Sequence, residues 1–160
     1  MTKITRSLLV GLGLILSCSA FANKKIDDNT PAYQTYQTVH VSISNHMSID
    51  CSRTNVYHPY GKLVDGNTFP YEIDKNDTAT FILREGMATG PDVTLTYRCG
   101  ADTFTVRAWQ SQCWLGYGCD AHGEIISKTN GITVDEPVDT KNASRYWNEY
   151  GQVHFTVRSK

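Results

Sequence analysis

The segment Asp120-Ala121-His122-Gly123-Glu124 brings together the residue types best suited to do chemistry. An imidazole between two carboxylates can bind a metal ion or activate a water molecule for hydrolysis. Two or three such groups within a short loop are also common by chance, so the segment alone does not establish an enzyme. A hydrolase that uses His122 with Asp120 or Glu124 is therefore one hypothesis for this chain.

Other catalytic signatures are missing from the sequence. It contains no G-x-S-x-G nucleophile elbow, no glycine-rich phosphate loop and no paired C-x2-4-C spacing of a thiolate metal site. His40 and His154 fall on the outward faces of predicted strands, where surface histidines are ordinary. We therefore predict no catalytic residue, no metal and no cofactor, and we favour a binding role over an enzymatic one.

Aromatic residues in two predicted loops are the strongest binding candidates. The first cluster lies in the short ring between Cys113 and Cys119, and the second lies at 146–150. Such side chains can stack on a sugar or enter a membrane interface, where Trp and Tyr are well accommodated. The alternative is that they pack on the core, as a plug at one end or as an edge covering. The candidate binding residues are Trp114, Leu115, Tyr117, Tyr146, Trp147 and Tyr150.

The first 22 residues have the pattern of a cleaved secretion signal. Lys3 and Arg6 precede an apolar stretch, and Ala20-Phe21-Ala22 supplies the small residues that flank a signal-peptidase site. Residues 23–37 are polar and without periodicity, which predicts a flexible arm. We expect the mature chain to be secreted or periplasmic.

The cysteines fit an exported protein. Removal of the signal takes away Cys18, which could otherwise be lipidated because the residues before it loosely resemble a lipobox. The remaining four allow three pairings, and an even number in an exported chain predicts two disulfides. We expect Cys113 to pair with Cys119 in a small ring and Cys51 with Cys99 across the fold. Each bridge would contribute about 2–4 kcal/mol.

Composition argues against two other settings. The chain has 15 Lys and Arg against 16 Asp and Glu, without a basic stripe, so nucleic acid is not an expected partner. The mean hydropathy is −0.37. No apolar run after the signal approaches the ~20 residues that span a bilayer, so we predict no transmembrane segment in the mature chain.

The elements that must position the candidate residues are strands. Apolar and polar residues alternate over 38–44, 93–99, 104–108 and 152–158, which is the period of a strand with one buried face. Roughly eight such segments and no amphipathic helix predict an all-β, antiparallel β-sandwich. We assign residues 38–160 to this single domain, in which pairing of the first and last strands would protect one sheet edge.

Turn chemistry separates the predicted strands. Gly100-Ala101-Asp102 predicts a hairpin between the strands on either side of it, and Asn55 to Gly66 is rich enough in Pro, Gly and Asp to predict a turn region. Asn130-Gly131 can take the positive φ values of a type I′ turn, which predicts a second hairpin joining 124–129 to 132–134.

The opening of the domain resembles the aegerolysin family. His40-Val41-Ser42-Ile43-Ser44-Asn45 is similar to the strand ending in Asn with which that family begins, and Tyr60-Gly61-Lys62-Leu63 with Asp65-Gly66 is similar to its Trp-Gly-Lys turn. The closing strand from Tyr150 to Val153 is compatible. The resemblance implies a β-sandwich that recognises membrane lipids, sometimes with a separate pore-forming partner, and it carries over Gly61 and Lys62 as turn residues.

The chain also departs from that family. Tyr60 replaces the tryptophan, and four cysteines with a cleaved signal are not typical of aegerolysins. The opening strand is similar as well to that of the plant S-protein homologues. Together, the features favour a secreted, toxin-like binding module that recognises a membrane lipid or a glycan through its aromatic loops. The alternative is a periplasmic inhibitor or immunity-type protein that blocks a partner enzyme by shape complementarity.

Overall fold

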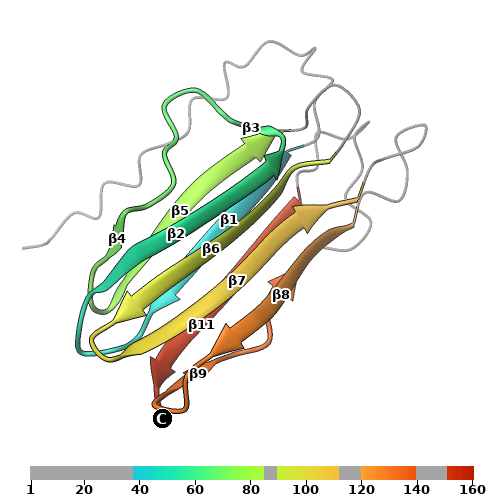
Figure 1. Ribbon diagram of the computed structural model, residues 1–160. Helices are drawn as coiled ribbons and strands as arrows, with labels where there is room; N and C mark the ends of the chain where they lie inside the picture. Colours follow the sequence, from blue (N-terminus) through green and yellow to red (C-terminus); the bar gives the residue numbers. More distant parts are fainter. Residues whose placement is uncertain (1–37, 85–89, 112–119, 140–150) are drawn as a thin grey trace, which may run out of the picture. The chain divides into compact units, whose positions relative to one another are not determined.

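A computed structural model of the chain describes residues 38–84, 90–111, 120–139 and 151–160. These residues contain eleven β-strands and no helix, arranged as two sheets packed face to face (Figure 1). The all-β sandwich predicted from the sequence is therefore confirmed. Within these described ranges, no helix has the length and apolarity needed to cross a bilayer.

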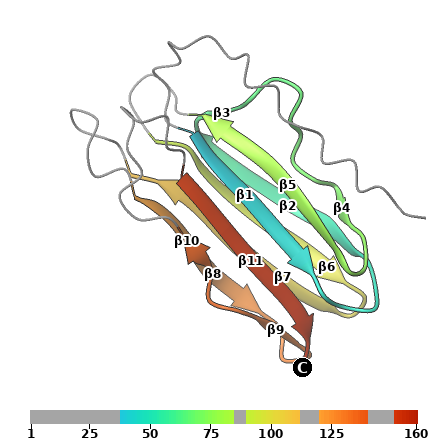
Figure 2. The ribbon, with the colours of Figure 1, turned by 180° about the vertical axis from the view of Figure 1, so that it is seen from behind.

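The two sheets divide the strands between them. One sheet has the order β10-β11-β1-β5-β3, with β9 also paired to β11, and the other has the order β4-β2-β6-β7-β8 (Figures 1 and 2). The six strands of the first sheet are β1 (Thr38–Asn45), β3 (Lys62–Leu63), β5 (Asp77–Arg84), β9 (Ile132–Val134), β10 (Val138–Asp139) and β11 (Gly151–Ser159). The five strands of the second are β2 (Cys51–Tyr60), β4 (Glu72–Ile73), β6 (Asp92–Cys99), β7 (Asp102–Gln110) and β8 (Ala121–Lys128).

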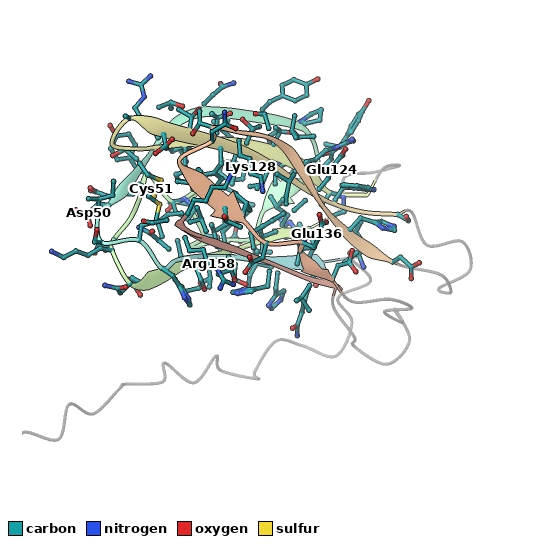
Figure 3. All side chains as sticks on the ribbon, turned by 90° about the horizontal axis from the view of Figure 1, so that it is seen from below. Asp50, Cys51, Glu124, Lys128, Glu136 and Arg158 are labelled. Carbon is teal, nitrogen blue, oxygen red and sulfur yellow. A yellow bond between two sulfur atoms is a disulfide. The ribbon has the colours of Figure 1, made fainter. Side chains whose placement is uncertain are left out.

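The core fills the space between the two sheets (Figure 3). Alternate residues of β1, β6, β7 and β11 point into it, because successive side chains of a strand face opposite sides of the sheet. The apolar positions predicted for the closing strand are confirmed as buried, as are those of β1 and β6. The largest fully buried side chains are Tyr97, Phe81, Phe104, Phe155, Ile43, Ile73, Leu83 and Leu95.

The predicted disulfide between Cys51 and Cys99 is confirmed, and both of its cysteines are fully buried. It joins the first residue of β2 to the last residue of β6, which are neighbouring strands of the same sheet, so the expectation that it crosses the fold is wrong. A disulfide in this chain is consistent with an exported protein, since such bonds persist in oxidising compartments. The second predicted pair, Cys113 with Cys119, lies outside the described residues.

The first and last strands pair as expected, but not in the predicted direction. β1 and β11 are parallel, with Val41 opposite Val153 and Ile43 opposite Phe155, so the first sheet is mixed rather than antiparallel. The period-two pattern that predicts a strand is the same in either direction. Because almost the whole domain separates the two strands in sequence, no short turn forces them to run antiparallel.

The hairpin predicted at Asn130-Gly131 is wrong. β8 pairs with β7 in one sheet, whereas β9 pairs with β11 in the other, so the chain changes sheet at this point. Neither residue has the positive φ that a type I′ turn requires. The crossover is held instead by Thr129, whose hydroxyl donates to Asp102 Oδ1 over 2.6 Å. By contrast, the hairpin predicted at Gly100 is confirmed, with Cys99 opposite Asp102.

The turn region predicted from Asn55 is also wrong over its first half. β2 continues to Tyr60, with register shifts against β6 that mark bulges between Arg53 and Asn55 and between Tyr57 and Tyr60. A bulge tolerates Pro59, which could not donate to a regular ladder. The chain turns at Gly61, whose φ of 91° favours glycine, and a Cβ there would lie 2.7 Å from the Arg84 carbonyl oxygen.

Candidate functional site

The six predicted binding residues, Trp114, Leu115, Tyr117, Tyr146, Trp147 and Tyr150, lie outside the described residues. The structure does define where their two segments begin and end. Gln110 and Ala121, which flank 112–119, are opposite each other, and a Cβ added at Gly151 would lie 2.7 Å from that of Ala121. Both segments are therefore attached to the same end of the sandwich, which we call the loop end.

Aromatic and charged side chains gather near this end, on the outward face of the five-stranded sheet. Directly opposed residues of neighbouring strands point to the same side, so the register defines two cross-strand rows. We call these eight residues the outer-face platform. The first row is Tyr60, Asp92, Trp109 and His122, and the second is Tyr57, Thr94, Arg107 and Glu124.

Trp109 lies at the centre of the platform, on β7. The His122 ring stacks on it, with centroids 5.0 Å apart and planes 23° apart. The Arg107 guanidinium lies over the same side chain, 4.7 Å from a ring centre. Ser111 and His122 Nε2 are 3.1 Å apart in a hydrogen bond that orients the imidazole. These contacts fix the indole as a rigid, half-buried surface.

An ion pair crosses the platform between β7 and β6. Arg107 donates to both carboxylate oxygens of Asp92, over 3.0 and 2.6 Å, and Asp92 is largely buried. The hydrogen bond to Asp92 raises the pKa of Arg107 above its ordinary value, and the nearby charges of Asp92 and Glu124 add to that increase. The guanidinium is therefore already neutralised by groups of the chain itself.

Tyr57 and Tyr60 complete the platform on β2. Their side chains are 63% and 51% exposed, which leaves most of each ring available to a ligand. Neither residue was expected at a site, because the surrounding sequence predicts a turn. Trp109 was not expected there either, although strict alternation along β7 places it on the opposite face from Ala108 and so predicts an aromatic residue outside the core.

The hydrolase hypothesis gains no support from the position of His122. Its ring is stacked on Trp109, its Nε2 is engaged by Ser111, and Glu124 lies in the other row, opposite Arg107. In the described ranges, no three His, Cys, Asp or Glu side chains come together in a way that could hold a metal ion. These contacts place His122 and Glu124 among neighbouring side chains of the sheet face.

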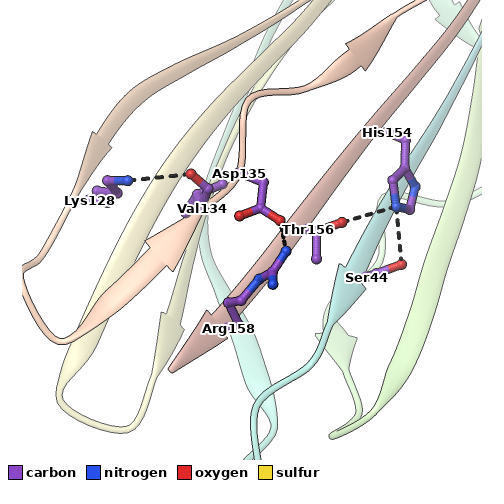
Figure 4. A network of polar contacts seen from close by, with 7 residues as sticks. All are labelled: Ser44, Lys128, Val134, Asp135, His154, Thr156 and Arg158. Carbon is purple, nitrogen blue, oxygen red and sulfur yellow. Dashed lines mark hydrogen bonds and ion pairs between the residues drawn. The ribbon is translucent and has the colours of Figure 1, made fainter. Parts of the chain in front are cut away.

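A second polar cluster lies on the outward face of the other sheet, around His154 (Figure 4). Ser42 Oγ is 2.7 Å from His154 Nδ1, and Nε2 is 3.2 Å from Thr156 Oγ1 and 3.5 Å from Ser44 Oγ. This confirms His154 as a cross-strand surface residue. Although serine and histidine are in contact, both ring nitrogens meet hydroxyl groups, so no carboxylate orients the imidazole as in a catalytic triad.

Comparisons with known proteins support the fold class. The sequence matches no known protein family and no curated protein sequence. The structure is similar to the crystal structure of IP-1A from Alcaligenes faecalis, with a TM-score of 0.50 and 16% identity over 78% of this chain and 91% of that one. It is also similar to the lipid binding protein Nakanori, with a TM-score of 0.52 and 10% identity over 78% of this chain and 71% of that one. At these identities the likeness concerns the fold alone.

Proposed function

We propose that this chain is an exported, non-enzymatic module that recognises a component of a membrane surface, a lipid or a glycan, with the loop end of its sandwich. The observation that carries the proposal is the outer-face platform, where Tyr57, Tyr60 and Trp109 gather beside the attachment points of both predicted aromatic segments. Exposed aromatic rings on a rigid sheet suit an interface that is partly apolar and partly wet.

Two further observations support this proposal. The sandwich is shared with a structure described as a lipid binding protein. The sequence also resembles the aegerolysins at its opening strand and at the turn of Gly61. The positive φ of Gly61 explains why a glycine is needed in that turn. In the proposal, Trp114, Leu115, Tyr117, Tyr146, Trp147 and Tyr150 extend the recognition surface beyond the platform.

Intrinsic tryptophan fluorescence offers a direct test, because the chain has three tryptophans and each is part of the proposed recognition surface. They are Trp109 on the platform and Trp114 and Trp147 in the predicted aromatic segments. The mature, oxidised protein would be titrated with vesicles of varied lipid composition. We expect a blue shift with one class of lipid, because the indoles would leave water for a less polar interface.

Three variants locate the response. Trp109→Phe, Trp114→Phe and Trp147→Phe each remove one fluorophore, so the variant that loses the shift identifies the tryptophan that enters the interface. An unchanged spectrum with every lipid would contradict the membrane proposal. Capture of one stoichiometric periplasmic protein in a pull-down would then favour the inhibitor or immunity-type alternative.

A further inference from the structure

The charge pattern of the outer-face platform restricts the chemistry of a ligand. Asp92 and Glu124 are carboxylates and Arg107 is the guanidinium between them, on the central strand of the three that carry these charges. Apart from the imidazole, the platform thus has one positive and two negative charges at neutral pH. A phosphate or sulfate group brought to it would meet a cation that is already paired with Asp92 and a second carboxylate, that of Glu124. The platform is therefore mismatched to an anionic ligand.

The platform is also mismatched to a quaternary ammonium group. Such a cation offers no hydrogen-bonding atoms, so it would cover Arg107 and Glu124 without replacing the water that they lose. The Trp109 ring already contacts the Arg107 guanidinium at 4.7 Å, so a second cation on that side would be repelled by a like charge.

A neutral sugar matches both parts of the platform. Its ring has an apolar face of C–H groups, which suits the exposed rings of Tyr57 and Tyr60, and its rim carries hydroxyls that donate and accept. Arg107 uses only two of its five N–H donors on Asp92, and Glu124 is an exposed acceptor beside it. The hydroxyl of Thr94 lies in the same row on the other side of Arg107, next to Tyr57, and can do both.

The same face continues as a row of polar side chains along the strands. Asn55, Thr96, Thr105 and Ser127 lie opposite one another in register, and the hydroxyls of Thr96 and Thr105 are 3.1 Å apart. Residues two apart along a strand are separated by about 7 Å, so this polar row lies directly beside the platform. It offers further hydrogen-bond donors and acceptors to a second sugar residue that is linked to the sugar on the platform.

We propose that the outer-face platform binds uncharged sugar residues, using Tyr57 and Tyr60 as stacking surfaces and Arg107, Glu124 and Thr94 as hydrogen-bonding groups. This inference rests on the proposed membrane function in one respect: if the chain binds a membrane surface, the sugar is the headgroup of a neutral glycolipid. The same chemistry would also bind a free neutral oligosaccharide.

The test uses the mature, oxidised protein with phosphatidylcholine vesicles, either plain or containing phosphatidylglycerol, galactosylceramide, glucosylceramide or a neutral oligosaccharyl ceramide. Sedimentation with the vesicles measures binding, and isothermal titration measures binding of free neutral oligosaccharides. We expect binding only when a neutral glycolipid is present, and competition by the corresponding free sugar.

Matched variants place the site on the platform. Tyr57→Ala and Glu124→Gln alter exposed side chains and should each weaken sugar-dependent binding by about tenfold or more, the loss expected for a central interface contact. Tyr71→Ala is the control, because Tyr71 is equally exposed, at 68%, but its carbonyl is bonded to Arg53 near the other end of β2. It should bind like the unaltered protein.

The outcomes separate this inference from the proposed function. Sugar-independent binding to plain or anionic vesicles would overturn the sugar site and leave the membrane function standing. Binding of free oligosaccharide without vesicle binding would support the sugar site and contradict the membrane function. Sugar-dependent binding that Tyr57→Ala and Glu124→Gln leave unchanged would overturn the assignment to the platform. Absence of binding in both assays would overturn both proposals.

Discussion

Asn45 provides the sharpest test of how the two sheets are held at the end of the sandwich opposite the loop end, and we expect Asn45→Ala to be strongly destabilising. The side chain is fully buried at the end of β1. Its Nδ2 donates to the carbonyls of Ile49, Ile73 and Asp74 at 2.8, 3.1 and 3.2 Å, and its Oδ1 accepts from the Met47 N–H at 3.0 Å. One amide therefore joins β1 to the loop before β2 and to the end of β4.

The size of the effect follows from which partners are shielded from water. The bonds to the Ile73 carbonyl and from the Met47 N–H are buried, whereas the other two are partly exposed. Leaving a buried polar group unpaired costs about 1–3 kcal/mol, so Asn45→Ala should lose about 3–5 kcal/mol of stability. For a domain of this size the melting temperature should fall by about 10–20 °C.

Urea unfolding of the oxidised protein, followed by circular dichroism, measures this loss, with His46→Ala as a control at the exposed neighbouring position. Asn45→Asp adds a pH test, because burial and three facing carbonyls should raise the pKa of the new carboxyl in the folded state. The folded state then holds the proton more tightly, so the stability of Asn45→Asp relative to the unaltered protein should be greatest below about pH 4 and fall as the pH rises. A loss under 1 kcal/mol in Asn45→Ala would refute the reasoning.

Two further predictions concern stability. The disulfide closes a sequence separation of 48 residues and restricts the unfolded chain. Replacing Cys51 and Cys99 together by alanine should therefore lower the free energy of unfolding by about 4 kcal/mol, measured by urea unfolding. An unchanged urea midpoint would contradict this reasoning. Burial lowers the pKa of His40 and of His58 below 6.5, so the unfolded state binds more protons in mild acid. Stability should therefore fall as the pH drops below about 6.5. The decrease in melting temperature between pH 7 and pH 5 should be smaller in His40→Gln and in His58→Phe than in the unaltered protein. An equal decrease in the variants would exclude these histidines as the cause.

Much of the fold could be predicted from local patterns. β1, β6, β7 and β11 appear in the sequence as alternating apolar and polar residues, because each strand buries one face against the opposite sheet. The hairpin at Gly100 could be predicted because its turn lies between two strong strands that are adjacent in sequence. The pairing of Cys51 with Cys99 followed from their number and from the small ring expected for the other two.

The errors arose where tertiary contacts outweigh local preference. Asn130-Gly131 has the sequence of a tight turn, yet Thr129 is bonded to Asp102 and the chain crosses to the other sheet, so no hairpin forms. Pro59 indicates a break, yet β2 continues past it because a bulge removes the need for its missing N–H. Local composition carries no information about Asp102, which binds Thr129, or about β6, against which the bulge of β2 forms.

The sequence by itself determined that this chain is a β-sandwich in which Cys51 pairs with Cys99, since periodicity and cysteine number are properties of the chain alone. It could not determine the outer-face platform, whose members come from β2, β6, β7 and β8 and lie as far apart in sequence as Tyr57 and Glu124. Only strand order and register bring them together, because a shift of one residue in any ladder would turn its side chains to the opposite face. The candidate site is therefore a product of tertiary pairing.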